Sequence, residues 1–313
     1  MNETTVLATL GPLTLTAYSL LLALGAAAAI VLTALLGRKR LGAESTLSLC
    51  LAVIPGAVVG ARLVYCLTMI ESILVDFGGW SFFPKLWEGG FTLYGAILGG
   101  MLAAWLYARA THRQAAPLMD LLAPGASLML CVARAAEYFT SQGLGDYMED
   151  EAMQRFPFAV EGVWATWQMP VFIYEAAAAL VIGLVVLWVL RAGRDGRAAE
   201  VFIILLGLTQ ILFESWREDE FIRFGFVRFN QIAAAVTVAF VVAMSLARQV
   251  KARGWTLWQI LRIVLFLLGV VIVILIEFAL DKSTIDNALL YFVMAATLVM
   301  MGAASLVEGR RTC

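Results

Sequence analysis

The sequence predicts an all-α polytopic membrane protein, and three observations support this fold class. Of its 313 residues, 62% are hydrophobic and only 14% are charged, whereas soluble domains are about half apolar and a quarter charged. The apolar residues fall in runs long enough to cross a bilayer, which takes about 20 residues per helix. The positive charges also collect on alternate loops between these runs, which is typical of inserted helices.

Nine apolar runs are candidate transmembrane helices. They lie near residues 12–36, 46–70, 92–109, 120–139, 169–190, 200–216, 229–247, 258–280 and 287–307. The first run should remain in the mature protein, because Glu3 rather than a positive segment precedes it. In the third run Gly95 and Gly99 are four residues apart, a spacing typical of a seam where two helices pack closely.

Loop charges predict the orientation of the helices. When the loops are assigned alternately from an outer N-terminus, the inner side carries more lysine and arginine than the outer side. The inner set is Arg38, Lys39, Arg40, Arg109, Arg113, Arg191, Arg194, Arg197, Arg248, Lys251, Arg253, Arg310 and Arg311, and the outer set is Lys85, Arg155, Arg217, Arg223, Arg228 and Lys282. Positive loops remain in the cytoplasm, so we expect the N-terminus outside and the C-terminus in the cytoplasm.

The chain divides into a core and a C-terminal addition. Residues 1–254 form the predicted membrane core, and residues 255–313 form an additional two-helix hairpin. The longest outer segment, about residues 140–168, is rich in acids, tryptophan and proline. It should form a small extracytoplasmic head.

Polar side chains at membrane depth mark the candidate site. They are Tyr18, Arg62, Tyr94, Arg134, Glu137, Gln142, Tyr174, Glu175, Gln210 and Glu214. A charge inside the bilayer costs roughly 2.5–3.5 kcal/mol on insertion scales and usually lines a cavity or pairs. Because these residues come from six different helices, they predict one polar cavity that opens outward. Plainer interpretations stay open: Arg134 and Glu137 neutralise each other, Glu175 begins a helix, and Arg217 anchors at the interface.

The cysteines and the histidine exclude several kinds of site. Cys50, Cys66, Cys131 and Cys313 show no metal-ligand spacing. The sole histidine, His112, lies in a basic inner loop. A Ser–His or Cys–His pair, or a histidine-bound metal, is therefore not expected in the outer cavity. We predict no metal, no cofactor and no nucleic-acid partner.

Six ordered segments resemble a known family, the prolipoprotein diacylglyceryl transferases. "VVGARLVY", with Arg62, resembles a glycine-arginine segment of that family. "LWEGGFTLYGAILGG" is similar to its W-x-G-G-x-x-x-H-G-G region, and "DLLAPGASLMLCVARAAEYFTSQGLG" to its D-x-x-A-P…G-R-x-x-N-F-x-N-x-E signature. "MPVFIYEA" resembles H-P-x-Q-x-Y-E, "QILFESWRED" resembles R-x-x-x-E-x-x-R, and "FNQI" resembles a G-Q segment.

The resemblance implies a seven-helix transferase-like core with an extracytoplasmic head in the bacterial cell membrane. The family transfers diacylglycerol from phosphatidylglycerol to the cysteine thiol of a prolipoprotein and releases glycerol 1-phosphate. The resemblance implies catalytic roles for Tyr94, Arg134, Glu137 and Glu214. It also implies substrate-binding roles for Tyr18, Arg62, Gln142, Gly145, Tyr174, Glu175, Gln210, Arg217 and Gln231. Phosphatidylglycerol and a prolipoprotein signal peptide are the expected partners.

The chain departs from the family pattern at four positions. Tyr94 stands for a histidine, Glu137 for an asparagine, Gln142 for a glutamate and Gln210 for an arginine. A phenol, with a reference pKa of about 10, donates hydrogen bonds rather than accepting a proton at neutral pH. The changes at Glu137 and Gln210 remove positive charge from the expected anion site.

These departures keep other functions open. One alternative is a non-catalytic lipid-binding or assembly protein that keeps the fold and meets a membrane partner through its two C-terminal helices. A transporter is a further alternative, although the chain shows no inverted repeat.

Overall fold

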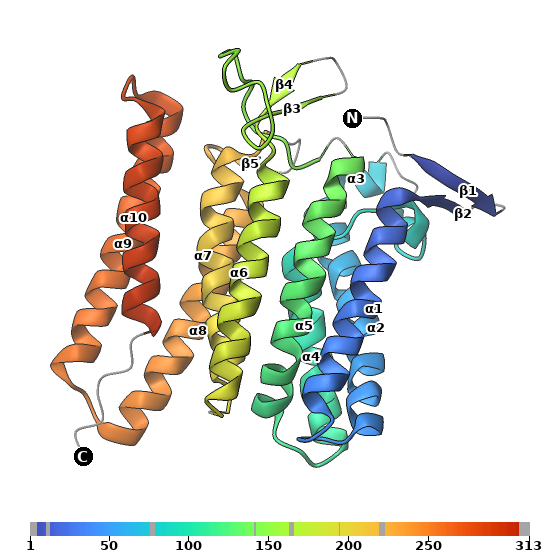
Figure 1. Cartoon of the computed structure of the whole chain (residues 1–313). Helices are drawn as coiled ribbons and strands as arrows, with labels where there is room; N and C mark the ends of the chain where they lie inside the picture. The colour runs from blue at the N-terminus through green and yellow to red at the C-terminus, as the bar shows by residue number, and fades with distance from the viewer. Residues whose placement is uncertain are drawn as a thin grey trace. The chain divides into compact units, whose positions relative to one another are not determined.

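A computed structural model describes residues 5–306, apart from 11–12, 76–78, 141, 163–165, 194 and 219–222. Arg194, Arg310, Arg311 and part of the predicted head therefore lie outside the described residues. The longer helices are α1 (Ala17–Gly37), α2 (Ala43–Thr68), α4 (Leu93–Ala110), α5 (Ala115–Ala136), α6 (Val171–Arg191), α7 (Arg197–Trp216), α8 (Phe229–Arg253), α9 (Leu257–Lys282) and α10 (Asn287–Leu306) (Figure 1). The short helices are α3 (Ile70–Val75), η1 (Gly79–Phe82), η2 (Leu86–Glu88) and η3 (Glu137–Phe139).

The helices confirm the all-α membrane fold class. Within the described part of the chain, eight helices are long and apolar enough to cross a membrane. The helix α4 forms where the third run predicts it but is not among these eight; its glycines, tyrosines and arginine lower its mean hydropathy. Large apolar side chains stay exposed along the helices, for example Leu51 (71%), Trp188 (73%) and Phe292 (71%). Lipid covers such surfaces in an integral membrane protein.

The N-terminus corrects one predicted boundary. The first run was expected to be helical from residue 12, but β2 (Leu13–Thr16) pairs antiparallel with β1 (Val6–Leu10). The helix α1 begins after Thr16, whose Oγ1 accepts the Ser19 N–H at 3.1 Å, while the Ser19 hydroxyl oxygen accepts the Thr16 N–H at 2.9 Å. This reciprocal cap fixes the start of the helix. Hydropathy alone did not distinguish the strand from the helix.

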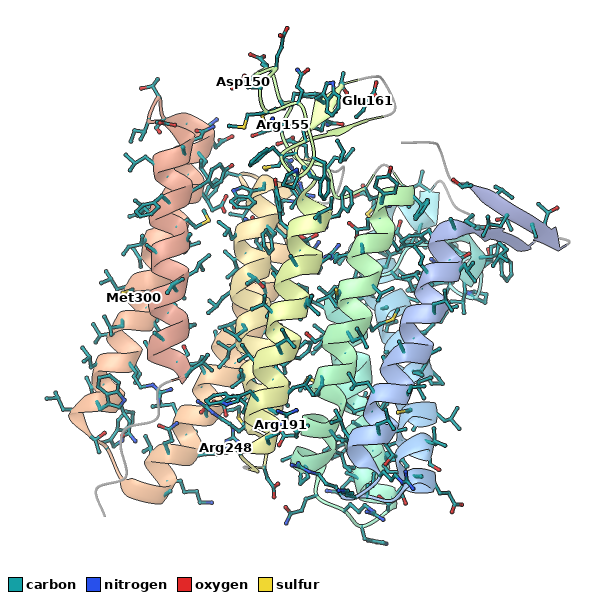
Figure 2. All side chains as sticks on the ribbon, viewed as in Figure 1. Asp150, Arg155, Glu161, Arg191, Arg248 and Met300 are labelled. Atoms are coloured by element: carbon teal, nitrogen blue, oxygen red, sulfur yellow. The ribbon has the colours of Figure 1, made fainter. Side chains whose placement is uncertain are left out.

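The chain forms two compact units. The first contains residues 1–142, 161–165 and 179–199, and the second contains 143–160, 166–178 and 200–313. In the first unit α2 packs on α4, and α1 packs on α5. In the second unit α9 packs on α10. That unit also holds a polar loop with Asp150 and Arg155, which extends beyond the N-terminal end of α6 (Figure 2).

The described residues also form two further two-stranded sheets. They are formed by β3 (Val160–Glu161) with β4 (Trp167–Gln168), and by β5 (Arg223–Phe224) with β6 (Val227–Arg228). The first of these lies in the segment predicted to form the head. The second precedes α8 directly and follows α7 in the chain, and both helices carry site residues.

A buried carboxylate fixes the start of α7. Asp120 on α5 is only 2% exposed. Its Oδ1 accepts the Ala199 N–H at 2.8 Å, and its Oδ2 accepts the Gly196 N–H at 2.5 Å. A carboxylate satisfies the free N–H groups and matches the partial positive charge at a helix N-terminus. The first residue of the "DLLAP" segment therefore has a structural role.

The glycine seam predicted in the third run is present, and its partner is α2. A Cβ atom placed on Gly99 would overlap the carbonyl oxygen of Gly56, and one on Gly95 would lie 2.5 Å from the carbonyl oxygen of Gly60. The two helix backbones therefore touch directly. By contrast, a Cβ on Gly100 would meet only Ala57 and Val53 at 3.6 Å, an ordinary contact.

This contrast predicts opposite effects for two neighbouring substitutions. Gly99→Ala forces the α2 and α4 backbones apart, so the free energy of unfolding should fall by about 1–3 kcal/mol. Gly100→Ala, the matched control, should be neutral or stabilise the helix by up to about 1 kcal/mol. Unfolding of the purified protein in detergent measures both values. Equal stabilities of the two variants would contradict the packing of the seam.

Candidate functional site

The ion pair between Arg134 and Glu137 lies at the end of α5. Arg134 Nη1 is 2.6 Å from Glu137 Oε1, and both side chains are largely buried. The helix ends here because η3 begins at Glu137, whose carbonyl oxygen accepts the Thr140 N–H at 2.9 Å. The i,i+3 spacing therefore brings the two charges together, as the sequence predicted. An arginine and a carboxylate in contact can each exchange their partner for an ionic substrate.

All the N–H groups of the Arg62 guanidinium donate hydrogen bonds to backbone carbonyl groups. The side chain is 0% exposed. Its N–H groups donate to the carbonyl oxygens of Phe82, Phe83, Lys85, Gly89 and Gly90. A guanidinium has five N–H donors, so this arrangement leaves none for a phosphate oxygen. Arg62 is placed to hold the loop between α3 and α4 rather than to contact a ligand directly.

The same part of α2 fixes the start of α4, where Tyr94 lies. The Thr92 N–H donates to the carbonyl oxygen of Ala61 at 3.2 Å, and Thr92 Oγ1 accepts the Gly95 N–H at 3.2 Å. Tyr94 is 4% exposed. Of the other two candidates in this unit, Tyr18 is half-buried in the first turn of α1, and Gln142 is exposed.

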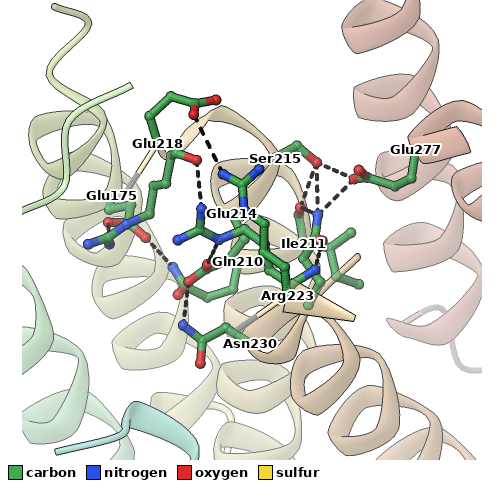
Figure 3. A network of polar contacts seen from close by, with 12 residues as sticks. Glu175, Gln210, Ile211, Glu214, Ser215, Glu218, Arg223, Asn230 and Glu277 are labelled. Carbon is green, nitrogen blue, oxygen red and sulfur yellow. Dashed lines mark hydrogen bonds and ion pairs between the residues drawn. The ribbon is translucent and has the colours of Figure 1, made fainter. Parts of the chain in front are cut away.

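In the second unit, Glu175 belongs to a buried polar network (Figure 3). Its Oε2 accepts Arg217 Nη1 at 2.7 Å, and its Oε1 accepts the Gln210 side-chain amide at 2.8 Å. Glu175 and Gln210 are each 2% exposed, and Arg217 is 7% exposed. Gln210 stands where the family pattern has an arginine, and it supplies a neutral donor to the same carboxylate.

A second ion pair continues this network. Arg228 Nε donates to Glu214 Oε2 at 3.0 Å, and Asn230 Nδ2 donates to Glu214 Oε1 at 2.9 Å. Arg228 Nη1 also donates to the carbonyl oxygen of Arg217 at 2.8 Å. Gln231 accepts the Arg228 N–H at 2.9 Å. The two arginines and two carboxylates are thus held in one connected arrangement.

The polar loop before α6 contributes to the same network. Gly145 forms a β-bridge with Arg217, and the Glu218 N–H donates to the carbonyl oxygen of Leu144 at 2.9 Å. A Cβ on Gly145 would overlap the carbonyl oxygen of Trp216. The Tyr174 hydroxyl donates to the carbonyl oxygen of Pro157 at 3.0 Å. Gly145 is therefore required for close backbone approach.

The structure adds residues that the sequence did not single out. Arg228 was counted among the loop charges, but it is only 4% exposed and pairs with Glu214. Arg228 lies three residues before Gln231, a predicted site residue, and this proximity could have marked it as a site residue as well. Asn230 and Ser215 also belong to the network. The single polar cavity expected from the sequence stays a prediction.

These observations define a class: a polytopic membrane protein that keeps arginine–carboxylate pairs buried at the ends of its helices. Comparison with known sequences identifies the family. Residues 5–275 match the sequence model of the prolipoprotein diacylglyceryl transferases. The chain therefore belongs to the prolipoprotein diacylglyceryl transferase family, and the match extends into α9.

Three relatives are named phosphatidylglycerol–prolipoprotein diacylglyceryl transferase. The protein of Frankia alni is 32% identical over 254 residues, which cover 77% of this chain and 65% of the relative. That of Bifidobacterium adolescentis is 28% identical over 260 residues, covering 77% of each chain. That of Synechococcus elongatus is 27% identical over 248 residues, covering 74% of this chain and 82% of the relative.

The buried network predicts a large difference between two charge-removing substitutions. Glu175→Gln removes the carboxylate that pairs with the buried guanidinium of Arg217, which should lower the free energy of unfolding by about 3 kcal/mol. Glu218→Gln removes a carboxylate that is 49% exposed and 3.5 Å from Arg223, so it should cost no more than about 1 kcal/mol. Denaturation in detergent measures both. A Glu175→Gln variant as stable as Glu218→Gln would contradict the central role of this pair.

Proposed function

We propose that this protein transfers the diacylglyceryl group of phosphatidylglycerol to the cysteine thiol of a prolipoprotein. The sulfur attacks the carbon of the diacylated glycerol that bears the phosphate. A carbon–sulfur bond forms, and the bond from that carbon to the phosphate oxygen breaks. Glycerol 1-phosphate leaves and carries one additional negative charge. The thiol proton passes to a base. The membership of the family over residues 5–275 is the observation that carries this proposal.

The reaction needs cations at the leaving phosphate and a proton acceptor near the thiol. Arginine suits the first task, because its planar fork binds two phosphate oxygens at once. A thiol, with a reference pKa near 8.5, must lose its proton to become the nucleophile. The buried arginine–carboxylate pairs supply both kinds of group within the low-dielectric part of the protein, where their effect on a developing charge is strongest.

Arg134 is the proposed phosphate anchor and Glu137 the proposed base. At rest they are paired at 2.6 Å. A phosphate that takes the guanidinium releases the carboxylate from its counter-ion, and a carboxylate without a counter-ion accepts a proton more readily. In this scheme lipid binding switches Glu137 from counter-ion to base. Tyr94 donates a hydrogen bond to the lipid where the family pattern has a histidine.

The remaining candidates have supporting roles. Glu214 holds Arg228, and Glu175 with Gln210 holds Arg217, so that these arginines keep a fixed orientation. Tyr18, Gln142, Tyr174 and Gln231 contact the lipid or the signal peptide, and Gly145 allows the close backbone contact beside Arg217. Arg62 acts indirectly, by positioning the loop that leads to Tyr94.

The protein resides in the bacterial cell membrane with its N-terminus outside and its C-terminus in the cytoplasm. The excess of arginine and lysine in the alternate loops supports this orientation. The segment 140–168 then forms an extracytoplasmic head, where a prolipoprotein signal peptide arrives. Residues 1–254 form the transferase core, and residues 255–313 add α9 and α10.

The family membership favours a transferase over a non-catalytic lipid-binding or assembly protein. The comparisons give no support to a further membrane partner at the C-terminal helices. A direct assay decides between the two functions. The protein is placed in nanodiscs of phosphatidylglycerol with a prolipoprotein signal peptide that carries one cysteine. We expect the peptide to gain the mass of one diacylglyceryl group; an unmodified peptide would contradict the proposal.

Replacing Arg134 by lysine tests the phosphate anchor. The variant keeps the charge but loses the planar fork, so affinity for phosphatidylglycerol should fall about tenfold. Arg109→Lys is the matched control, because Arg109 is exposed near the last turn of α4, where it lies over Trp105. It should leave affinity unchanged. Equal binding of the lipid by both variants would exclude Arg134 as the anchor.

Replacing Glu137 by glutamine tests the base. Glutamine keeps the shape but accepts no proton, so transfer should fall about 100-fold or more, while phosphatidylglycerol binds at least as tightly. Glu71→Gln, at an exposed position in α3, should keep normal transfer. A Glu137→Gln variant with tighter lipid binding and undiminished transfer would show that Glu137 is only a counter-ion.

A further inference from the structure

A pocket in the second unit opens beside the C-terminal end of α7, the β5–β6 hairpin and α9. Its volume is about 60 Å³, and its lining includes Ser215, Arg217, Arg223, Arg228, Gln231 and Glu277. One water requires roughly 10–15 Å³ of such space. The pocket therefore accommodates a group of several non-hydrogen atoms.

Among the described residues, each charged side chain that lines this pocket, apart from Glu277, forms an ion pair. Arg217 pairs with Glu175, Arg228 pairs with Glu214, and Arg223 pairs with Glu218. Glu277, on α9, is 8% exposed. Within the described ranges, no lysine or arginine lies in salt-bridge distance of it. A carboxylate without a cation is expensive at membrane depth, so its presence calls for a functional explanation.

Glu277 lines the pocket, and its hydrogen bonds to described residues are made by one of its two carboxylate oxygens (Figure 3). Its Oε1 accepts both the Gln231 side-chain amide at 2.7 Å and the Ser215 hydroxyl. Its Oε2 has no hydrogen-bond donor among the residues that the structure describes. The two bonds to Oε1 fix the orientation of the carboxylate. A fixed acceptor at a pocket wall selects a ligand that carries a donor at that point.

Arg223 supplies a cation that can bind an anionic group of the same ligand. This side chain is 48% exposed, and its Nη2 lies 3.5 Å from Glu218 Oε2. Such an exposed and loose pair is weak, so a phosphate oxygen can replace the carboxylate at little cost. The pocket thus offers a cation for a phosphate and a fixed acceptor for a donor on the same small group.

We propose that this pocket is a subsite for a lipid headgroup, in which Glu277 Oε2 accepts a hydrogen bond from a headgroup hydroxyl while Arg223 contacts the phosphate. This inference rests on the proposed function and names what sets its lipid preference. It also makes the added helix α9 part of the substrate site. Within the described part of the second unit, Glu277 is a specificity residue that belongs to none of the six segments that resemble the family.

The test compares two lipids of equal charge. Phosphatidylglycerol carries headgroup hydroxyls, and phosphatidylmethanol has the same phosphodiester without them. Competition for the full-length protein in detergent, with equal acyl chains and native mass spectrometry as the readout, gives the ratio of affinities. We expect about a tenfold preference for phosphatidylglycerol, the effect of one hydrogen bond to a charged group. Equal binding of the two lipids by the unaltered protein would overturn the proposal.

Two variants locate the preference. Glu277→Gln should reduce the ratio to within about twofold of unity, because it removes the charged acceptor. Asp281→Asn is the matched control, since it removes the same charge one turn further along α9 from a partly exposed position beside Lys282. It should keep the tenfold ratio. A Glu277→Gln variant that retains the full preference would overturn the assignment.

The binding ratio does not depend on turnover. A protein that prefers phosphatidylglycerol in this way but transfers nothing to a peptide would contradict the proposed function and support the subsite. A protein that transfers diacylglycerol but binds both lipids equally would support the proposed function and overturn the subsite. Tighter binding of phosphatidylethanolamine than of phosphatidylglycerol would overturn the hydroxyl assignment, because an ammonium would then be the preferred donor.

Discussion

The ion pair between Glu175 and Arg217 organises the second unit. The guanidinium binds the carboxylate at 2.7 Å, the backbone of Arg217 bridges to Gly145, and its carbonyl oxygen accepts Arg228. Arg228 then holds Glu214. One buried pair thus connects α6, the end of α7, the polar loop and the start of α8. Because an unpaired charge is so costly at membrane depth, each member of this chain of contacts restricts the next.

The first unit meets the same constraint by a different route. Arg62 is buried but pairs with carbonyl groups, so its charge orders the loop between α3 and α4 instead of remaining available to a ligand. Arg134 keeps a carboxylate partner, which the phosphate of the lipid replaces in the proposed reaction. The comparison separates two uses of buried arginine. One stabilises irregular backbone, and the other, in the proposed function, provides a site for an anion.

Much of this fold was predictable, because a membrane helix is encoded by a run of apolar residues. The Arg134–Glu137 pair was predictable as well, since it depends only on helical spacing. The β1–β2 hairpin was not, because its apolar residues continue into α1 and hydropathy does not separate them. The roles of Asp120, Arg228 and Glu277 were also missed, because their partners are distant in the sequence. The sequence shows where a charged residue lies in an apolar run, but it does not show which residue pairs with it.

In the proposed reaction, arginines hold the phosphate as it leaves, so that the carbon–oxygen bond of the lipid breaks. The direct measurement is the identity of both products formed from phosphatidylglycerol and a cysteine peptide. We expect one glycerol 1-phosphate to be released for each peptide modified, and the modified peptide to contain no phosphorus. Release of free glycerol, with the phosphate retained on the peptide, would contradict this reaction.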